Sequence, residues 1–375
     1  MNDSPVDDTS DRHGLRAQKL RTAAAVVVAV VAVVAAVLAL SRGDIENPPV
    51  SAAEFPSELD VVTTTVQTSG PIHTPAWSAD ARSAYGREFA AFRSPAAGLM
   101  FDSGAYGVVD GGDVLVAAMG LPNPRSYSLD DVELVGIDVS DGAVKWSASP
   151  GGIDSCASRP ARGELLCLDP YSDAPAVVAV SVADGAIRRI PFPDGWFPFA
   201  IESDGDSVYI LEGNPEDSES VLHGGTVDVL ADAWSLPIAS FASWEGVEGT
   251  LIHVDDGRGV VTLGGEAEFF DTGSGVAVDD LELRSETSVV ETDSGAEVWQ
   301  LIDPYAAGIS VGQTRYEQSG DSVTATVIDT GDIEWTWPLP TGSDGFPASG
   351  SIVEAGSGVY FLDSDSIVQL EPRGE

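Results

Sequence analysis

The sequence is poor in basic residues, and this scarcity excludes whole classes of partner. It has 18 Lys and Arg against 60 Asp and Glu, which gives a formal net charge of −42. Beyond residue 43 the basic residues are scattered, apart from the adjacent pair Arg188 and Arg189. Because nucleic-acid phosphates are bound by clusters of Lys and Arg, we expect no nucleic acid and no acidic polyanion among the partners.

The chain also lacks long helical periodicity beyond residue 74. A short helix is expected within residues 79–92, and the remainder consists of short Val-, Ile- and Leu-rich runs separated by Gly and Asp turns. With 43% hydrophobic residues the chain can bury a large core, so disorder is excluded as a description of the whole. The sequence therefore predicts an all-β domain.

One long apolar run stands near the start of the chain. Residues 22–40 carry no charge and, as a helix rising about 1.5 Å per residue, would extend roughly 28 Å, the thickness of a bilayer core. Arg42 is the one basic residue that follows this run closely. Four basic residues precede it, namely Arg12, Arg16, Lys19 and Arg21. The positive-inside rule predicts a cytoplasmic tail (1–21), a transmembrane helix (22–40) and a domain outside the cell.

A cleaved signal peptide is the alternative, with Ala39, Leu40 and Ser41 as a weak cleavage site. The length of the run and of the leader before it favours an uncleaved anchor. Residues 41–74 have Pro, Ser and Thr throughout, which predicts an extracellular tether with at most one short strand. Residues 43–375 carry 56 acidic and 13 basic residues, so the net negative charge lies in the predicted external part.

A repeated motif indicates which all-β architecture to expect. The clearest copies are SDGAVKW at 140–146, DTGDIEW at 329–335 and TDSGAEVW at 292–299, in which a Trp follows a turn Gly by four residues; Gly142 with Trp146 and Gly331 with Trp335 are the best pairs. Weaker copies have Gly185 with Arg189 in place of Trp, and Gly275 with Asp279. A missing copy is expected near 225–234, and the 292–299 copy breaks the phase.

The spacing of the motif is that of a β-propeller. Gly142 and Gly331 are 189 residues apart, which is four steps of about 47 residues, inside the range of propeller blades. We predict about six, possibly seven, four-stranded blades within residues 75–375. The segment Pro75-Ala76-Trp77-Ser78 resembles the outer strand at Lys145-Trp146, so we expect it to complete the last blade.

These motifs resemble those of PQQ-like, or quinoprotein-type, β-propeller repeat proteins. The resemblance covers about residues 104–371 and implies that each Trp docks on the neighbouring blade. The related enzymes hold a quinone and Ca²⁺, and many have a disulfide between adjacent cysteines. This chain has no adjacent Cys pair and no recognisable ligand motif, so we predict no cofactor and no quinone chemistry. The scarcity of Lys, two against 16 Arg, resembles the bias of high-GC actinobacterial coding.

The sequence has two cysteines, Cys156 and Cys167, on either side of Pro160-Ala161-Arg162-Gly163. In an antiparallel hairpin centred between Ala161 and Arg162 they stand opposite each other, and outside the membrane a disulfide is the expected state. Free thiols or a metal pair are the alternatives, although no His lies nearby.

Several acidic turns could offer oxygen ligands to Ca²⁺, yet none matches the spacing of a known Ca²⁺ loop. They contain Asp102, Asp110, Asp113, Asp204, Asp206, Asp255, Asp256, Asp363 and Asp365. Ordinary solvated turns are the alternative, and a Ca²⁺ site stays unsupported.

No nucleophile, base and orienting group are recognisable together, so the sequence does not predict an enzyme. A propeller offers a rigid ring with variable loops, and binding is its usual use when no catalytic set is visible. We therefore predict a membrane-anchored extracellular binding or scaffold module for a protein, a glycan or a cell-envelope component. An extracytoplasmic oxidoreductase, hydrolase or lyase on the same scaffold is the alternative.

Overall fold

The computed structural model describes residues 70–96, 106–125, 128–193, 195–214, 219–238, 251–255, 257–263, 266–278, 282–284, 298–300, 308–341, 345–356 and 358–372. The predicted cytoplasmic tail, membrane span and most of the tether lie outside them. Within the described part of the chain, no helix is long and apolar enough to cross a membrane. The chain divides into two units, Met1–Val66 and Gln67–Glu375, and every described residue belongs to the second.

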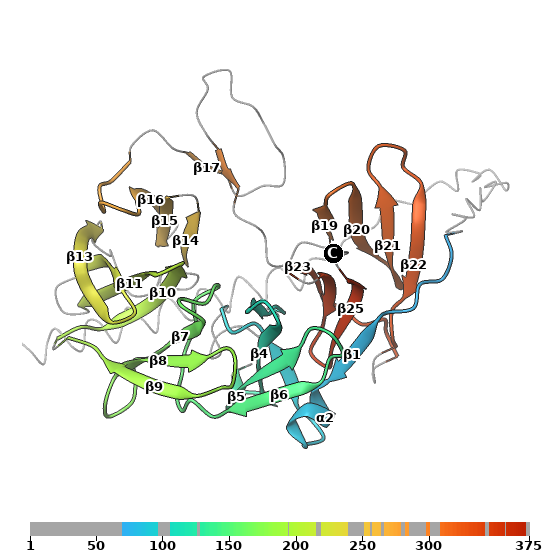
Figure 1. Ribbon diagram of the computed structural model, residues 1–375, viewed down its shortest axis with the longest axis horizontal. Helices are drawn as coiled ribbons and strands as arrows, with labels where there is room; N and C mark the ends of the chain where they lie inside the picture. The colour runs from blue at the N-terminus through green and yellow to red at the C-terminus, as the bar shows by residue number, and fades with distance from the viewer. Residues whose placement is uncertain are drawn as a thin grey trace, which may run out of the picture. The chain divides into compact units, whose positions relative to one another are not determined.

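The second unit is built almost entirely of strands (Figure 1). Its helix α2 (Ala81–Tyr85) has one turn, because Asp80 caps its start and Gly86 ends it in the left-handed conformation, with φ +74°. The helix expected within residues 79–92 therefore covers only part of that range. The first and last residues of the range belong to the strands Trp77–Asp80 and Ala91–Arg93.

We number the antiparallel sheets in chain order. Sheet 1 contains β2 (Ala91–Arg93), β3 (Val109–Asp110), β4 (Val114–Pro122), β5 (Leu129–Asp138) and β6 (Val144–Ala148). Sheet 2 contains β7 (Glu164–Asp169), β8 (Ala176–Ser181) and β9 (Ile187–Pro191), and sheet 3 contains β10 (Pro198–Asp204), β11 (Ser207–Asn214), β12 (Glu219–Thr226) and β13 (Val229–Ile238).

The remaining strands follow the same plan with one exception. Sheet 4 contains β14 (Leu251–Asp255), β15 (Arg258–Leu263) and β16 (Glu266–Asp271), and sheet 5 contains β19 (Gly308–Val311), β20 (Thr314–Ser319), β21 (Ser322–Val327) and β22 (Ile333–Pro338). Sheet 6 contains β23 (Ser351–Ala355), β24 (Gly358–Leu362), β25 (Ser366–Pro372) and β1 (Trp77–Asp80). The exception is the parallel pair β17 (Glu282–Arg284) and β18 (Val298–Gln300), where the phase-breaking motif copy ends.

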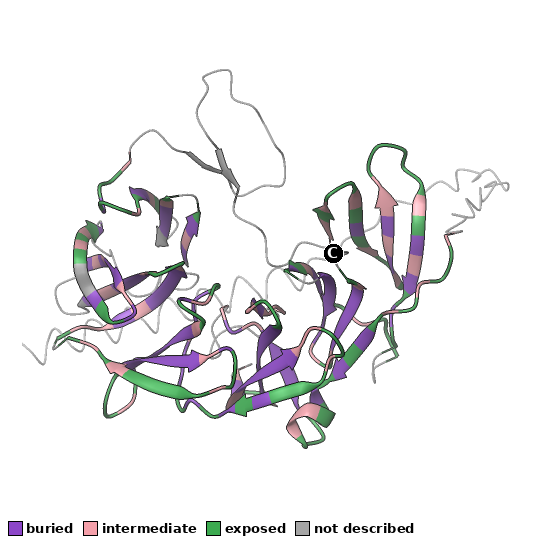
Figure 2. Ribbon diagram, viewed as in Figure 1, coloured by how far each residue is buried: buried purple, intermediate pink, exposed green. Residues whose placement is uncertain are grey.

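Sheets 1 to 4 pack face to face in chain order, as do sheets 5, 6 and 1, and this explains the continuous apolar runs of the sequence. In β4, Leu115 contacts the core shared with sheet 6, whereas its neighbour Val116 contacts the core shared with sheet 2. Successive side chains of a strand point to opposite faces, so a strand with both faces covered has no polar alternation. Figure 2 shows the contrast with the outer strand β9, which is exposed along most of its length.

The N-terminal strand completes the last sheet. β1 pairs antiparallel with β25, with Trp77 opposite Gln369 and Asp80 opposite Ser366. The expectation that this segment closes the last blade is confirmed. A series of packed, antiparallel sheets closed by a strand from the other end of the domain is the arrangement of a β-propeller. The number of blades stays a prediction, because much of the chain between sheets 4 and 5 lies outside the described residues.

Residues at the end of the predicted tether also belong to this closure. Ile72 forms a parallel bridge with Thr336 of β22, and the backbone N–H of His73 donates to the carbonyl of Thr336 at 2.9 Å. The chain thus contacts the edge of sheet 5 before it enters sheet 6.

Candidate functional site

The repeated motif folds into one kind of turn. In four copies the N–H of the motif Gly donates to the carbonyl four residues earlier at 2.8–2.9 Å, with Gly φ between +67° and +74°: Gly142, Gly185, Gly275 and Gly331. A left-handed backbone favours glycine because it has no Cβ. The motif is therefore a turn that only glycine fills without strain.

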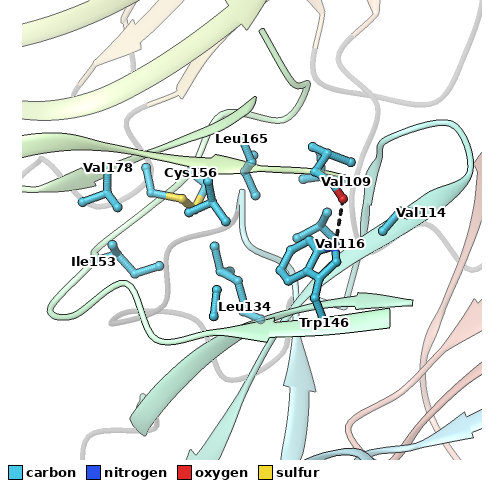
Figure 3. Close-up of a cluster of buried hydrophobic side chains, with 14 residues drawn as sticks. Val109, Val114, Val116, Leu134, Trp146, Ile153, Cys156, Leu165 and Val178 are labelled. Atoms are coloured by element: carbon cyan, nitrogen blue, oxygen red, sulfur yellow. Dashed lines mark hydrogen bonds between the residues drawn. A yellow bond between two sulfur atoms is a disulfide. The ribbon is translucent and has the colours of Figure 1, made fainter. Parts of the chain in front are cut away.

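The Trp of one sheet packs on the Gly turn of the next. A Cβ added to Gly185 of sheet 2 would lie 2.7 Å from the ring of Trp146 on β6, and the indole N–H of Trp146 donates to Val182 at 2.8 Å. Figure 3 shows Trp146 in the apolar cluster between sheets 1 and 2, together with Cys156.

The same arrangement occurs at two other junctions. Trp77 of sheet 6 packs on Gly142 of sheet 1, and Trp234 of sheet 3 packs on Gly275 of sheet 4. Trp335 of sheet 5 differs, since its indole donates to the Glu371 carboxylate at 2.9 Å and its ring stacks on His73. Gly331 has no atom within 4 Å of an added Cβ. The motif residues Gly142, Trp146 and Trp335 thus lie at junctions between sheets.

The junction of sheets 2 and 3 departs from this pattern. Arg189 takes the Trp position on β9, and its side chain turns to its own sheet, where it pairs with Asp169. The guanidinium also donates to the carbonyl of Ala174 at 3.1 Å and to the hydroxyl of Ser172 at 3.3 Å. Arg189 therefore fixes the loop between β7 and β8, which carries Tyr171.

The disulfide predicted between Cys156 and Cys167 is present. Cys156 and Cys167 form an antiparallel bridge, so they stand opposite each other as predicted. Nearer the tip the centre of the pairing shifts by one residue, and Ala161 bridges Glu164 around the turn Arg162-Gly163. Both residues of the turn have positive φ, which Gly163 supplies readily. The disulfide holds residues 154–157 against β7 at the inner edge of sheet 2.

Asp154 lies two residues before this disulfide and is buried, with one of its two carboxylate oxygens unpartnered. Its side chain is 6% exposed, its Oδ1 has no hydrogen-bond partner, and its backbone N–H donates to Leu168 at the end of β7. Burial raises the pKa of the Asp154 carboxyl to about 6. The charged form therefore lowers the stability of the folded state by about 3 kcal/mol at pH 7.

The charge of Asp154 acts on an exposed aromatic side chain, Tyr171. Burial and then the charge of Asp154 raise the pKa of Tyr171, whose side chain is nevertheless 60% exposed. The Tyr171 ring meets the edge of Phe197 with centroids 6.3 Å apart. We call Asp154, Tyr171 and Phe197 the Asp154 site.

A second group of aromatic and acidic side chains continues from the Asp154 site into sheet 3. The N–H of Phe197 donates to Glu212 at 3.4 Å, and His223 lies 3.5 Å from the same carboxylate. The His223 ring stacks on Trp196 with centroids 3.9 Å apart. Burial lowers the pKa of His223 although Glu212 opposes this shift.

The opposite ends of these sheets carry a cluster of charged residues whose partners all come from the protein itself. Glu202 is 5% exposed and accepts hydrogen bonds from the N–H groups of Ser158 at 3.0 Å and Ser203 at 2.8 Å. Arg159 lies 3.6 Å from Asp204 and 3.8 Å from Asp255. Burial raises the pKa of Glu202 to about 7. Since its groups pair with one another across sheets 2, 3 and 4, we assign this cluster to packing.

Two of the acidic turns named from the sequence have carboxylates that accept hydrogen bonds from backbone N–H groups. Asp110 accepts from the N–H groups of Gly112 and Gly356, and Asp363 accepts from those of Asp365 and Ser366. Among the described residues, no three His, Cys, Asp or Glu side chains are placed to hold a metal ion. Asp102 and Asp256 lie outside those residues.

Sequence reasoning did not find Asp154 or Tyr171. The signal present was an Asp two residues before a cysteine, together with a motif copy whose Trp had become Arg189. A single Asp among so many acids carries no signal without knowledge of its burial.

Comparison with known proteins gives structural likeness alone. The sequence matches no known protein-family model and no curated protein. Among solved structures, the chain is similar to BamB from Moraxella catarrhalis (16% identity, 72% of this chain and 74% of that chain, TM-score 0.32). It is also similar to a gluconolactonase from Xanthomonas campestris (12% identity, 73% and 89%, TM-score 0.36) and to a nidogen/laminin complex (12%, 65% and 83%, 0.32). The propeller assignment rests on the strand pairing of this chain.

Proposed function

We propose that this protein is a membrane-anchored binding module whose propeller lies outside the cell and takes its ligand at the Asp154 site. The predicted span at residues 22–40 and the basic flank before it support the anchoring and the orientation.

The observation that carries the binding role is the buried Oδ1 of the Asp154 carboxyl, which has no hydrogen-bond partner. Buried polar groups are nearly always paired, and an unpaired one lowers stability. Strained or unsatisfied groups of this kind gather at functional sites, where a ligand supplies the missing partner. Tyr171 adds an exposed ring on the loop after β7, and the charge of Asp154 acts on its pKa. Apolar surface with a directed polar group is the combination found in binding sites.

Site-specific cross-linking in the intact cell tests the binding role. A photo-reactive residue is placed at Asp173, on the exposed loop of Tyr171, and for comparison at Glu88, an exposed position in the turn after α2. We expect cross-linked product from position 173 and none from position 88, and we expect Tyr171→Ala to remove it. Equal products from both positions would contradict a site on the Tyr171 loop.

Protease treatment tests the orientation separately. External protease should remove a C-terminal tag from intact cells, while a tag at the N-terminus stays protected. Protection of the C-terminal tag would reverse the proposed topology without bearing on the site.

A further inference from the structure

The Asp154 site offers a hydrogen-bond acceptor and an aromatic face, and both suit a positively charged group. A carboxylate oxygen accepts hydrogen bonds and cannot donate them when ionised. The face of a Tyr ring attracts ammonium and guanidinium groups through its quadrupole. The basic residue that the structure places at this end of sheet 2, Arg189, is already held by Asp169.

The net negative charge of the predicted external part also favours a positively charged ligand. With 56 acids against 13 basic residues after residue 42, the domain attracts cations and repels anions before contact. A partner with exposed Lys or Arg side chains would therefore be drawn towards the domain. A neutral glycan would gain nothing from this field.

We propose, on the basis of the binding role proposed above, that the Asp154 site receives a Lys or Arg side chain from a basic segment of a partner protein. The cationic group pairs with the Asp154 carboxylate and lies against the ring of Tyr171. Arg189 keeps the Tyr171 loop in place, and the disulfide keeps Asp154 against β7.

This pairing couples binding to protonation. Asp154 is ionised above about pH 6, and a bound cation favours the ionised form. At this end of sheet 2, Asp169 of β7 and Arg189 of β9 pair with each other, and the charge of Asp154 acts on Tyr171 of the loop after β7. Binding of a cation therefore releases a proton below about pH 6, and affinity falls as the pH is lowered through this range.

The test uses the full chain in nanodiscs of zwitterionic lipid at about 0.15 M salt, where long-range attraction is screened. The probes are hexalysine, hexaglutamate and the neutral sugar maltohexaose. We expect hexalysine alone to bind. Asp154→Asn should weaken it at least tenfold and Tyr171→Ala several-fold, whereas Asp173→Asn, which removes an exposed charge from the same loop, should change it less than twofold.

The pH profile gives the second readout. Between pH 6 and pH 5 the hexalysine affinity of the unaltered protein should fall several-fold, while the affinity of Asp154→Asn should stay flat. Equal loss in Asp154→Asn and Asp173→Asn would show unspecific attraction to an acidic surface and overturn the proposal.

The remaining outcomes separate this inference from the proposed function. Binding of maltohexaose that depends on Asp154 and Tyr171 would replace the basic segment by a glycan and leave the binding role standing. If no probe binds and cross-linking at position 173 also fails, Asp154 is a structural charge and both proposals are wrong.

Discussion

The junction between sheets 1 and 2 and the junction between sheets 2 and 3 use the same motif position in opposite ways. In the first, Trp146 packs on the Gly185 turn of the next sheet and donates to Val182. In the second, Arg189 holds a loop of its own sheet through Asp169 and Ala174. The copy with Trp146 joins two sheets, and the copy with Arg189 supports the Tyr171 loop of its own sheet.

The largest expected effect breaks the intact junction. Trp146→Ala removes a side chain that is 9% exposed and should lower the free energy of unfolding by about 3–5 kcal/mol. Arg189→Ala, at the equivalent position of sheet 2, should lower it by less, about 1–3 kcal/mol, because Asp169, whose side chain is 2% exposed, loses its ion-pair partner. Urea denaturation of both variants measures the difference. Equal losses would show that Arg189 joins sheets as Trp146 does.

The second effect has the opposite sign and concerns the altered junction. Asp154→Asn should raise the free energy of unfolding at pH 7, by up to about 3 kcal/mol, because it removes a buried charge. The folded-state pKa of Asp154 lies above its ordinary value, so the penalty exists above about pH 6 and fades as the pH falls towards 4. The gain of the variant should therefore shrink over that range.

Denaturation of both proteins from pH 4 to pH 8 measures this gain. The raised pKa of Glu202 gives the two proteins the same additional pH dependence, which cancels in the difference. A gain that does not change with pH would mean that Asp154 is not a buried ionisable group.

The smallest effect sharpens the role of the glycine turns. Gly185→Ala places a Cβ 2.7 Å from the Trp146 ring in a left-handed turn, with φ +73°. Gly163→Ala has the same backbone strain, with φ +76°, but no atom within 4 Å of the new Cβ. We expect a loss of about 1 kcal/mol at Gly163 and about 1–2 kcal/mol more at Gly185. Thermal unfolding of the two variants measures the losses of stability. Equal losses would show that contact with the Trp146 ring does not add to the cost at Gly185.

Part of the fold could be read from the sequence because it depends on local chemistry. The Gly turn with φ > 0, the Trp four residues later and the period of about 47 residues predicted the sheets, since a motif that repeats forms the same unit each time. The extra outer strand at Trp77 could be read in the same way, and β1 confirms it. The short helix expected within residues 79–92 is present as α2, and it covers only part of that range because Gly86 ends it in the left-handed conformation.

The contacts at the site could not be read from the sequence. The period showed that Arg189 stands in a Trp position, but not that it turns back to Asp169 and the loop of Tyr171. Likewise, the hairpin that places Cys156 opposite Cys167 was predictable, whereas the shift of pairing that places its turn at Arg162-Gly163 was not, because such a shift leaves the composition unchanged.

What the sequence by itself determined was the sign of the charge, the strand content, the repeat and the pairing of its two cysteines, each of which follows from residue type and spacing. The tertiary structure alone decided which of the many carboxyls is buried without a partner. Burial is a property of several sheets together, since Asp154 lies against β7 while Phe197, which meets Tyr171, comes from the connection to sheet 3. A pKa depends on the water and the donors that such packing removes, and neither is written in the order of the residues.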